Sequence, residues 1–143
     1  MTRVRNYSPE DYEAIIALYK IGGLFGGQFD KARDSREKLA EVTKRDPESI
    51  LVYDEDGTIR GTVSLIENGR VAWLFRFAVQ DVDSKADIIA KALYKKSKEV
   101  LKLRGHNQVL VYSDPDNQGL NKRYESLGMT SGDCYQCFWD VME

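Results

Sequence analysis

The chain of 143 residues has the usual size of one domain and can bury a continuous core. Hydrophobic residues make up 42% of it and charged residues 31%, with both signs interspersed, a composition that argues against a disordered or membrane-spanning chain. The formal net charge of −2 gives no bulk attraction to nucleic acid or anionic lipid, so we expect neither a nucleic-acid partner nor a membrane.

The amino-terminal residues 1–7 are basic but have no apolar run behind them. No stretch of about 18 consecutive apolar residues occurs in the sequence, which is the length a membrane-spanning helix needs. We therefore expect a cytoplasmic protein that forms a single domain over residues 1–143.

Helix signals dominate the first third of the chain. Ser8 and Pro9 form a helix start, a hydroxyl cap followed by proline at the first helical position, and apolar residues then recur at helical spacing up to Tyr19. Glycines between residues 22 and 27 end this helix. A second helix is predicted from Ser35 to the region before Pro47.

Strand signals follow in the middle of the chain. Residues 49–53, 58–66 and 71–79 are rich in β-branched and aromatic side chains, and the tight-turn pairs at 56–57 and 68–69 separate them. The sequence therefore predicts an antiparallel meander, with a short first strand near residues 4–7.

The spacing of the apolar residues changes again in the last part of the chain. A long helix is predicted to end at Gly105, followed by a strand over 107–112, which makes a parallel pair with the meander by the handedness of crossover connections. A further helix ends at Gly128, and residues 134–142 are predicted to form a last strand. The expected fold class is α+β, a mixed and mostly antiparallel sheet in the order β-α-α-β-β-β-α-β-α-β with one parallel crossover pair.

Cys134 and Cys137 are the two cysteines of the chain, and their spacing raises the question of a metal or redox site. In a strand, positions three apart point to opposite faces, and His106 is the one histidine that might join them as a ligand. We expect two ordinary thiols and no bound metal.

One segment resembles a known family. In residues 116–129, DNQGLNKRYESLGM, seven positions match the pattern of the GNAT superfamily of acyl-CoA-dependent N-acetyltransferases, and the predicted order of elements agrees with that family over nearly the whole chain. The matching residues are Asn117, Leu120, Tyr124, Glu125, Leu127, Gly128 and Met129.

This resemblance implies transfer of an acetyl group from acetyl-CoA to a primary amine, by direct attack in a ternary complex. The backbone of the strand end Phe77-Ala78-Val79 would pair with the pantetheine arm, Asn117 would touch the cofactor, and the Tyr124 hydroxyl would protonate the departing CoA thiolate. From the residues alone, packing is the favoured role for Tyr124, and Asn117 is at least as well explained as a helix cap.

The turn before the long helix departs from the family pattern, in which glycine lets backbone amides approach the pyrophosphate of CoA. The resemblance assigns Lys85, Ala86 and Ala90 to this site, but Ile88 stands where the glycine is expected. Ser84 and Asp87 also have the spacing of a capping box, which would occupy the same amides. Asp81 and Asp83 add negative charge.

Two explanations of this turn compete. In one, the protein is an acyltransferase that holds its co-substrate mainly by the pantetheine arm. In the other, the fold persists but acetyl-CoA binding has been lost, which leaves a binding or regulatory protein.

The acceptor side of the site is less defined by the sequence. Four glycines flank aromatic residues in 22–29, which suggests a mobile lid with Phe25 or Phe29 as an apolar wall, although an ordinary loop fits as well. Arg76 either selects an acidic acceptor or packs its stem over apolar neighbours. We expect Glu67 to be solvated and His106 exposed, so neither is favoured as a base.

Two kinds of partner are expected. The acceptor is a small-molecule or peptide amine, and the apolar last strand suggests pairing across a homodimer.

Overall fold

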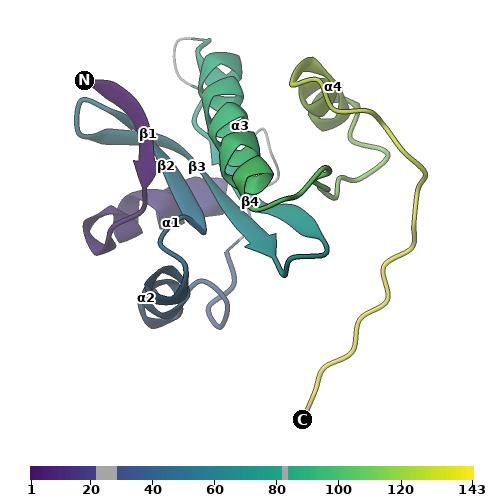
Figure 1. Ribbon diagram of the computed structural model, residues 1–143, viewed down its shortest axis with the longest axis horizontal. Coiled ribbons are helices and arrows are strands. Elements are labelled where there is room, and N and C mark those ends of the chain that lie inside the picture. Colours follow the sequence, from purple (N-terminus) through teal and green to yellow (C-terminus); the bar gives the residue numbers. More distant parts are fainter. Residues whose placement is uncertain (22–28, 82–83) are drawn as a thin grey trace.

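The computed structural model describes residues 1–21, 29–81 and 84–143, and Figure 1 shows their arrangement. The elements in chain order are β1 (Thr2–Asn6), the short 3-10 helix η1 (Pro9–Asp11), α1 (Tyr12–Ile21), α2 (Arg36–Arg45), β2 (Ile50–Glu55), β3 (Thr58–Glu67), β4 (Ala72–Val79), α3 (Ala86–Leu103) and α4 (Gln118–Ser126).

The sheet is the predicted antiparallel meander, with strand order β1-β2-β3-β4. Asp56 and Gly57 join β2 to β3 with φ angles of 51° and 90°, which is the geometry that a two-residue hairpin needs. Gly69 has a φ of 85° between β3 and β4. The turn pairs read from the sequence are therefore confirmed.

The two faces of the sheet carry different helices. On β2, Leu51 and Tyr53 point into the core beneath α3, while Ile50 and Val52 point into the core beneath α1 and α2. Helix α3 lies close against β3, because a β-carbon added at Gly61 would stand 2.8 Å from a side-chain methyl carbon of Ile89. The sheet thus holds α3 in a fixed position.

Strand β4 contains a bulge. Thr62 pairs with Ala78 and Ser64 pairs with Phe75, so one residue of β3 faces two of β4. Arg76 lies in this bulge with a φ of 50°, a left-handed conformation that is rare for a residue other than glycine. The bulge redirects the last residues of β4.

The second half of the chain differs from expectation. Leu110 forms one parallel bridge with Trp73, through hydrogen bonds from the Leu74 amide at 2.8 Å and to the Ala72 carbonyl at 2.9 Å. The predicted crossover orientation is seen at this one bridge, but no continuous strand forms over 107–112.

The prediction of a last strand is wrong in this structure. Residues 129–143, all of them described, contain neither helix nor strand, and Figure 1 shows them running away from the rest of the molecule. An alternating apolar pattern indicates that a segment can form a strand. A strand also needs the edge of another strand to pair with, and the pattern does not indicate which strand that is.

None of the helices in the described part of the chain has the length and hydrophobicity needed to cross a membrane.

Candidate acyl-transfer site

The candidate site begins where β4 leaves its neighbour. Beyond the bridge at Trp73, the described residues form no further bridge between β4 and residues 107–113. The strand continues to Val79, and the side chains of its last three residues are buried. The predicted pantetheine-binding stretch Phe77-Ala78-Val79 therefore lies in the part of β4 that no longer pairs with residues 107–113.

Tyr124 comes from α4 to the same region. Its ring centre lies 6.5 Å from that of Phe77, and only 7% of the residue is exposed. Burial raises the pKa of Tyr124 to about 12, so the phenol keeps its proton at neutral pH. Such a group can donate a hydrogen bond or a proton, but it does not serve as a base.

Tyr124 lines a groove of about 1130 Å³ that runs between α3, residues 107–113 and α4. Tyr94 and Leu101 of α3 and Val111 contribute apolar walls. The groove is thus large enough for an extended organic ligand, and the tyrosine faces it from α4.

Asn117 acts as the cap of α4. Its side-chain oxygen accepts a hydrogen bond from the Leu120 amide at 3.0 Å. The capping interpretation is therefore confirmed, and any contact between Asn117 and a cofactor stays a prediction.

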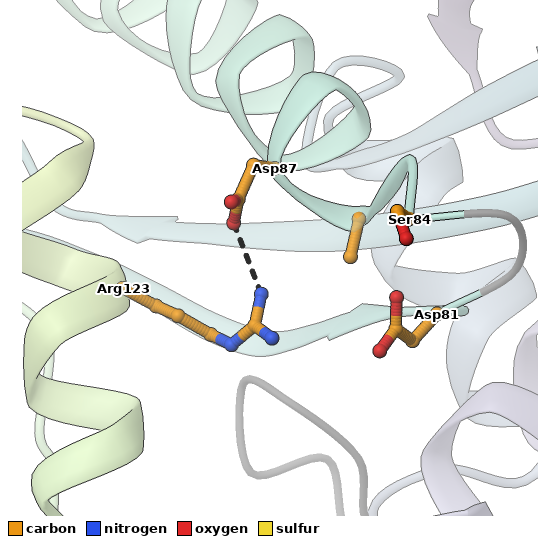
Figure 2. A pocket seen from close by; sticks show the side chains of 5 residues that line it. Asp81, Ser84, Asp87 and Arg123 are labelled. Carbon is orange, nitrogen blue, oxygen red and sulfur yellow. Dashed lines mark hydrogen bonds and ion pairs between the residues drawn. The ribbon is translucent and has the colours of Figure 1, made fainter.

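The turn before α3 is not capped in the predicted way. Ser84 adopts a φ of 57°, and the helix is preceded by Lys85 at the N-cap position. The Asp87 carboxylate accepts a hydrogen bond from Arg123 of α4 at 3.0 Å, as Figure 2 shows. The predicted capping box between Ser84 and Asp87 is wrong, because Lys85 rather than Ser84 holds the N-cap position, no side chain of the described residues caps the helix, and Asp87 has a cationic partner instead.

Arg123 makes a small pocket of about 170 Å³ with this turn. The pocket is lined by Asp81, Ser84, Ala86, Asp87 and Arg123. Figure 2 shows the guanidinium reaching from α4 toward the start of α3. Sequence reasoning missed Arg123, because its contact with Asp87 spans 36 residues and no local pattern indicates it.

Most of the other residues assigned to this turn lie away from the pocket beside Arg123. The Lys85 amine lies 3.5 Å from Glu55 of β2, and Ala90 is fully buried in the core under α3. Ala86 is buried but borders the pocket, while Ile88 is exposed. Of the predicted phosphate-binding residues, Ala86 alone lies beside Arg123.

Arg76 is held by a buried carboxylate on the opposite face of the sheet. Its guanidinium forms two contacts with Asp34, at 2.9 and 3.1 Å, and the two side chains are only 7% and 3% exposed. The guanidinium also lies 4.5 Å from the centre of the Phe75 ring. Asp34 neutralises the charge that Arg76 would need to select an acidic acceptor, and the contact with the Phe75 ring agrees with the alternative of apolar packing.

Phe25 and Phe29 were the two candidates for an apolar wall on the acceptor side. Phe29 is partly exposed, and the Lys20 amine lies 4.8 Å from its ring centre. Phe25 and most of the predicted lid, residues 22–28, lie outside the described residues.

Glu67 and His106 form a contact that sequence reasoning missed. The His106 Nε2 atom lies 2.7 Å from a Glu67 oxygen, and the histidine side chain is only 5% exposed. This hydrogen bond lowers the pKa of Glu67, with a smaller contribution from Arg104. The expectation of a solvated glutamate and an exposed histidine is wrong, because the turn after α3 folds back onto the β3–β4 hairpin.

Cys134 and Cys137 are free, exposed thiols. Among the residues that the structure describes, no group of three His, Cys, Asp or Glu side chains is placed to hold a metal ion.

No protein-family model matches the chain, and no curated protein matches it. Solved structures do match. A possible acetyltransferase from Clostridium difficile 630 has 16% identity and a TM-score of 0.74, covering 100% of this chain and 99% of its own. The PaiA N-acetyltransferase of Thermoplasma acidophilum, solved with coenzyme A, has 22% identity and a TM-score of 0.68, with 87% of both chains covered.

A third similar structure is the glucosamine-6-phosphate N-acetyltransferase of Arabidopsis thaliana. It has 15% identity and a TM-score of 0.69, and the match covers 97% of this chain and 98% of that one. All three similar structures are acetyltransferases, and each match covers most of both chains. The chain therefore has the GNAT fold, and the predicted α+β class is confirmed.

Proposed function

We propose that this protein is an N-acetyltransferase that transfers the acetyl group of acetyl-CoA to a primary amine. The observation that carries the proposal is the position of Tyr124, a buried and protonated phenol beside the end of β4 where that strand diverges from residues 107–113. The GNAT fold supports it, as does the coenzyme A bound to one structural neighbour.

In the proposed reaction, both substrates are held in one ternary complex. The backbone of residues 77–79 aligns the pantetheine arm, and the neutral amine attacks the thioester carbon. A carbon–nitrogen bond forms and the carbon–sulfur bond breaks. Tyr124 gives its proton to the departing thiolate and regains one from solvent, while the amine loses one, so protons balance.

We further propose that Arg123 supplies the positive charge that the phosphate-binding turn lacks. Its guanidinium already lies at the start of α3, where helix amides and the helix dipole favour an anion. Asp87 holds the guanidinium in place and also competes with a phosphate for it. Binding of the CoA diphosphate beside Ala86 therefore requires that Arg123 leave the Asp87 carboxylate and bind the diphosphate instead.

This exchange predicts opposite effects of two substitutions. Arg123→Met is expected to weaken CoA binding roughly 10- to 100-fold, because a charge-assisted hydrogen bond contributes about 1.5–3 kcal/mol. Asp87→Asn is expected to tighten binding, because it removes a negative charge near the phosphates and releases the guanidinium. Isothermal titration with CoA measures both.

The charge-matched control is Lys44→Met, which removes an exposed lysine on α2, across the sheet from α3. It should leave the affinity unchanged. Equal affinities for wild type and Arg123→Met would contradict the role of Arg123, while the enzyme itself would still stand if acetyl transfer persisted.

The second candidate is a binding or regulatory protein that has lost acetyl-CoA. The acidic side chains of Asp81 and Asp87 at the turn, together with an Arg123 already engaged by Asp87, favour it. No heat on titration with acetyl-CoA at millimolar concentration would select this candidate and reject the enzyme.

The acceptor is proposed to be a small-molecule or peptide amine that enters on the side of α1, near Phe29 and Arg76. Since Asp34 already pairs with Arg76, this arginine offers an acidic acceptor little attraction unless the pair opens.

A further inference from the structure

Helix α3 carries an excess of positive charge that the chain as a whole does not share. Residues 86–103 contain five lysines and two acids, although the whole chain has a formal net charge of −2. The surplus is therefore a property of this helix and of the surface that it presents.

Four of these lysines form one row along α3. They follow one another at intervals of four, three and four residues, which is the spacing of a single helix face, and all four are exposed. The members of this lysine row are Lys91, Lys95, Lys98 and Lys102. The row is about 16 Å long, because each helical residue adds about 1.5 Å along the axis.

The acids of α3 are matched by cations outside the lysine row. Asp87, one turn before Lys91, forms its ion pair with Arg123, and Glu99 lies 3.8 Å from the Lys96 amine. Among the residues that the structure describes, no member of the row forms an ion pair. The row therefore presents positive charge that is not neutralised, and such a surface favours an acidic partner.

The lysine row borders the groove that contains Tyr124. Lys98 and Lys102 line this groove of about 1130 Å³, and the Lys98 amine lies 4.7 Å from the ring centre of Tyr94, another lining residue. The row continues from there along the exposed face of α3 toward the start of the helix. A partner that rests on the row thus lies beside the groove, and a flexible arm on that partner can enter it.

The turn before α3 distinguishes two carriers of a pantetheine thioester. CoA brings a diphosphate and a further phosphate on its ribose, whereas a carrier protein holds the same arm through one phosphodiester with a single negative charge. Asp81 and Asp87 at the turn repel an anion in proportion to its charge. The single guanidinium of Arg123 matches a single phosphodiester. The turn therefore disfavours CoA more than it disfavours the arm of a carrier protein.

We propose that the lysine row docks an acidic acyl carrier protein, whose phosphopantetheine arm enters the groove toward Tyr124. Transfer of the acyl group from this arm rests on the proposed acetyltransferase function, and the carrier protein is then a donor in addition to acetyl-CoA. The carbon–nitrogen bond forms and the carbon–sulfur bond breaks. The amine loses a proton, the thiolate gains one, and the thiol stays on the arm of the carrier protein.

Isothermal titration with a small acidic acyl carrier protein in its phosphopantetheine form tests the docking surface. Binding should weaken as the salt concentration rises, because the lysine row is exposed. Lys95→Glu should weaken it roughly 5- to 10-fold, since attraction is replaced by repulsion of similar size. Lys44→Glu makes the same change on α2, across the sheet, and should leave the affinity unchanged.

Titration with acetyl-CoA separates the lysine row from a phosphate site for CoA itself. Lys95 is not part of the groove lining, so Lys95→Glu should leave the affinity for acetyl-CoA unchanged. An equal loss for both ligands would assign the row to the phosphates of CoA and overturn the proposal. A carrier protein that does not bind at low salt, or binds equally well to Lys95→Glu, would overturn it too. So would a DNA duplex of random sequence that binds the row more tightly than the carrier protein does.

A transfer assay with the acetylated carrier protein distinguishes failure of docking from failure of the proposed function. Transfer from acetyl-CoA without binding of the carrier protein would keep the acetyltransferase and overturn the docking surface. Binding that depends on Lys95, with no transfer from either donor, would keep the docking surface and reject the acetyltransferase. A carrier protein that binds but cannot replace acetyl-CoA as the donor would overturn the entry of the arm into the groove.

Discussion

Tyr124→Phe is expected to lower kcat for acetyl transfer by about 100-fold with little change in KM for acetyl-CoA. General acids contribute about 10² to 10⁴ in rate. The lower end applies here, since a phenol with a pKa of about 12 gives its proton uphill to a thiolate whose conjugate acid resembles a thiol with a pKa near 8.5. Steady-state kinetics with saturating amine measures the change.

The structure offers a matched control for this substitution. Tyr94 of α3 lines the same groove, is also buried, and has a pKa raised by burial. Tyr94→Phe should leave kcat within about twofold of wild type. Phenylalanine keeps the ring packing at both positions, including that of residue 124 on Phe77. Equal losses in the two variants would show that the hydroxyl of Tyr124 has no role in the chemistry.

Local signals predicted most of the fold because the features they describe are local. Ser35 was predicted to start a helix and does so, since its hydroxyl oxygen accepts a hydrogen bond from the Lys38 amide at 3.1 Å. The pair Asp56-Gly57 was predicted to make a tight turn, and both residues have positive φ angles. Each of these signals depends only on residues that are close neighbours in the sequence.

The candidate site was harder to predict because it depends on contacts between distant segments. Asp87 was assigned to Ser84, three residues away, but its partner Arg123 comes from another helix. His106 and Glu67 were each expected to face water, and they meet across 39 residues. Pairing of this kind follows from how helices sit on the sheet, and periodicity carries no information about it.

Tyr124 and Arg76 illustrate the difference between a motif and its surroundings. The match to the family pattern located Tyr124, and the structure adds the burial that keeps it protonated. For Arg76 the sequence offered an acceptor contact or apolar packing. The guanidinium in fact packs on the Phe75 ring while its charge is matched by Asp34, a partner that lies 42 residues earlier in the chain.

Asp34→Ala is expected to destabilise the protein by about 3–5 kcal/mol, because it leaves the buried Arg76 charge without its partner. It also removes the acceptor of the Asp30 amide, which donates to Asp34 at 2.8 Å. Urea unfolding followed by circular dichroism measures the change in free energy of unfolding. The exposed pair of Arg36 with Glu13 provides the comparison, and Glu13→Ala should cost less than about 1 kcal/mol.

The double variant with Asp34→Leu and Arg76→Met separates the two roles of this pair. Apolar residues of similar volume can replace a buried ion pair at little cost, so most of the lost stability should return. If the pair only fixes the segment before α2 to β4, the double variant should also keep its affinity for the amine acceptor. A stable double variant with a strongly raised KM for the amine alone would show instead that Arg76 contacts the acceptor, which requires the Asp34 pair to open during the reaction.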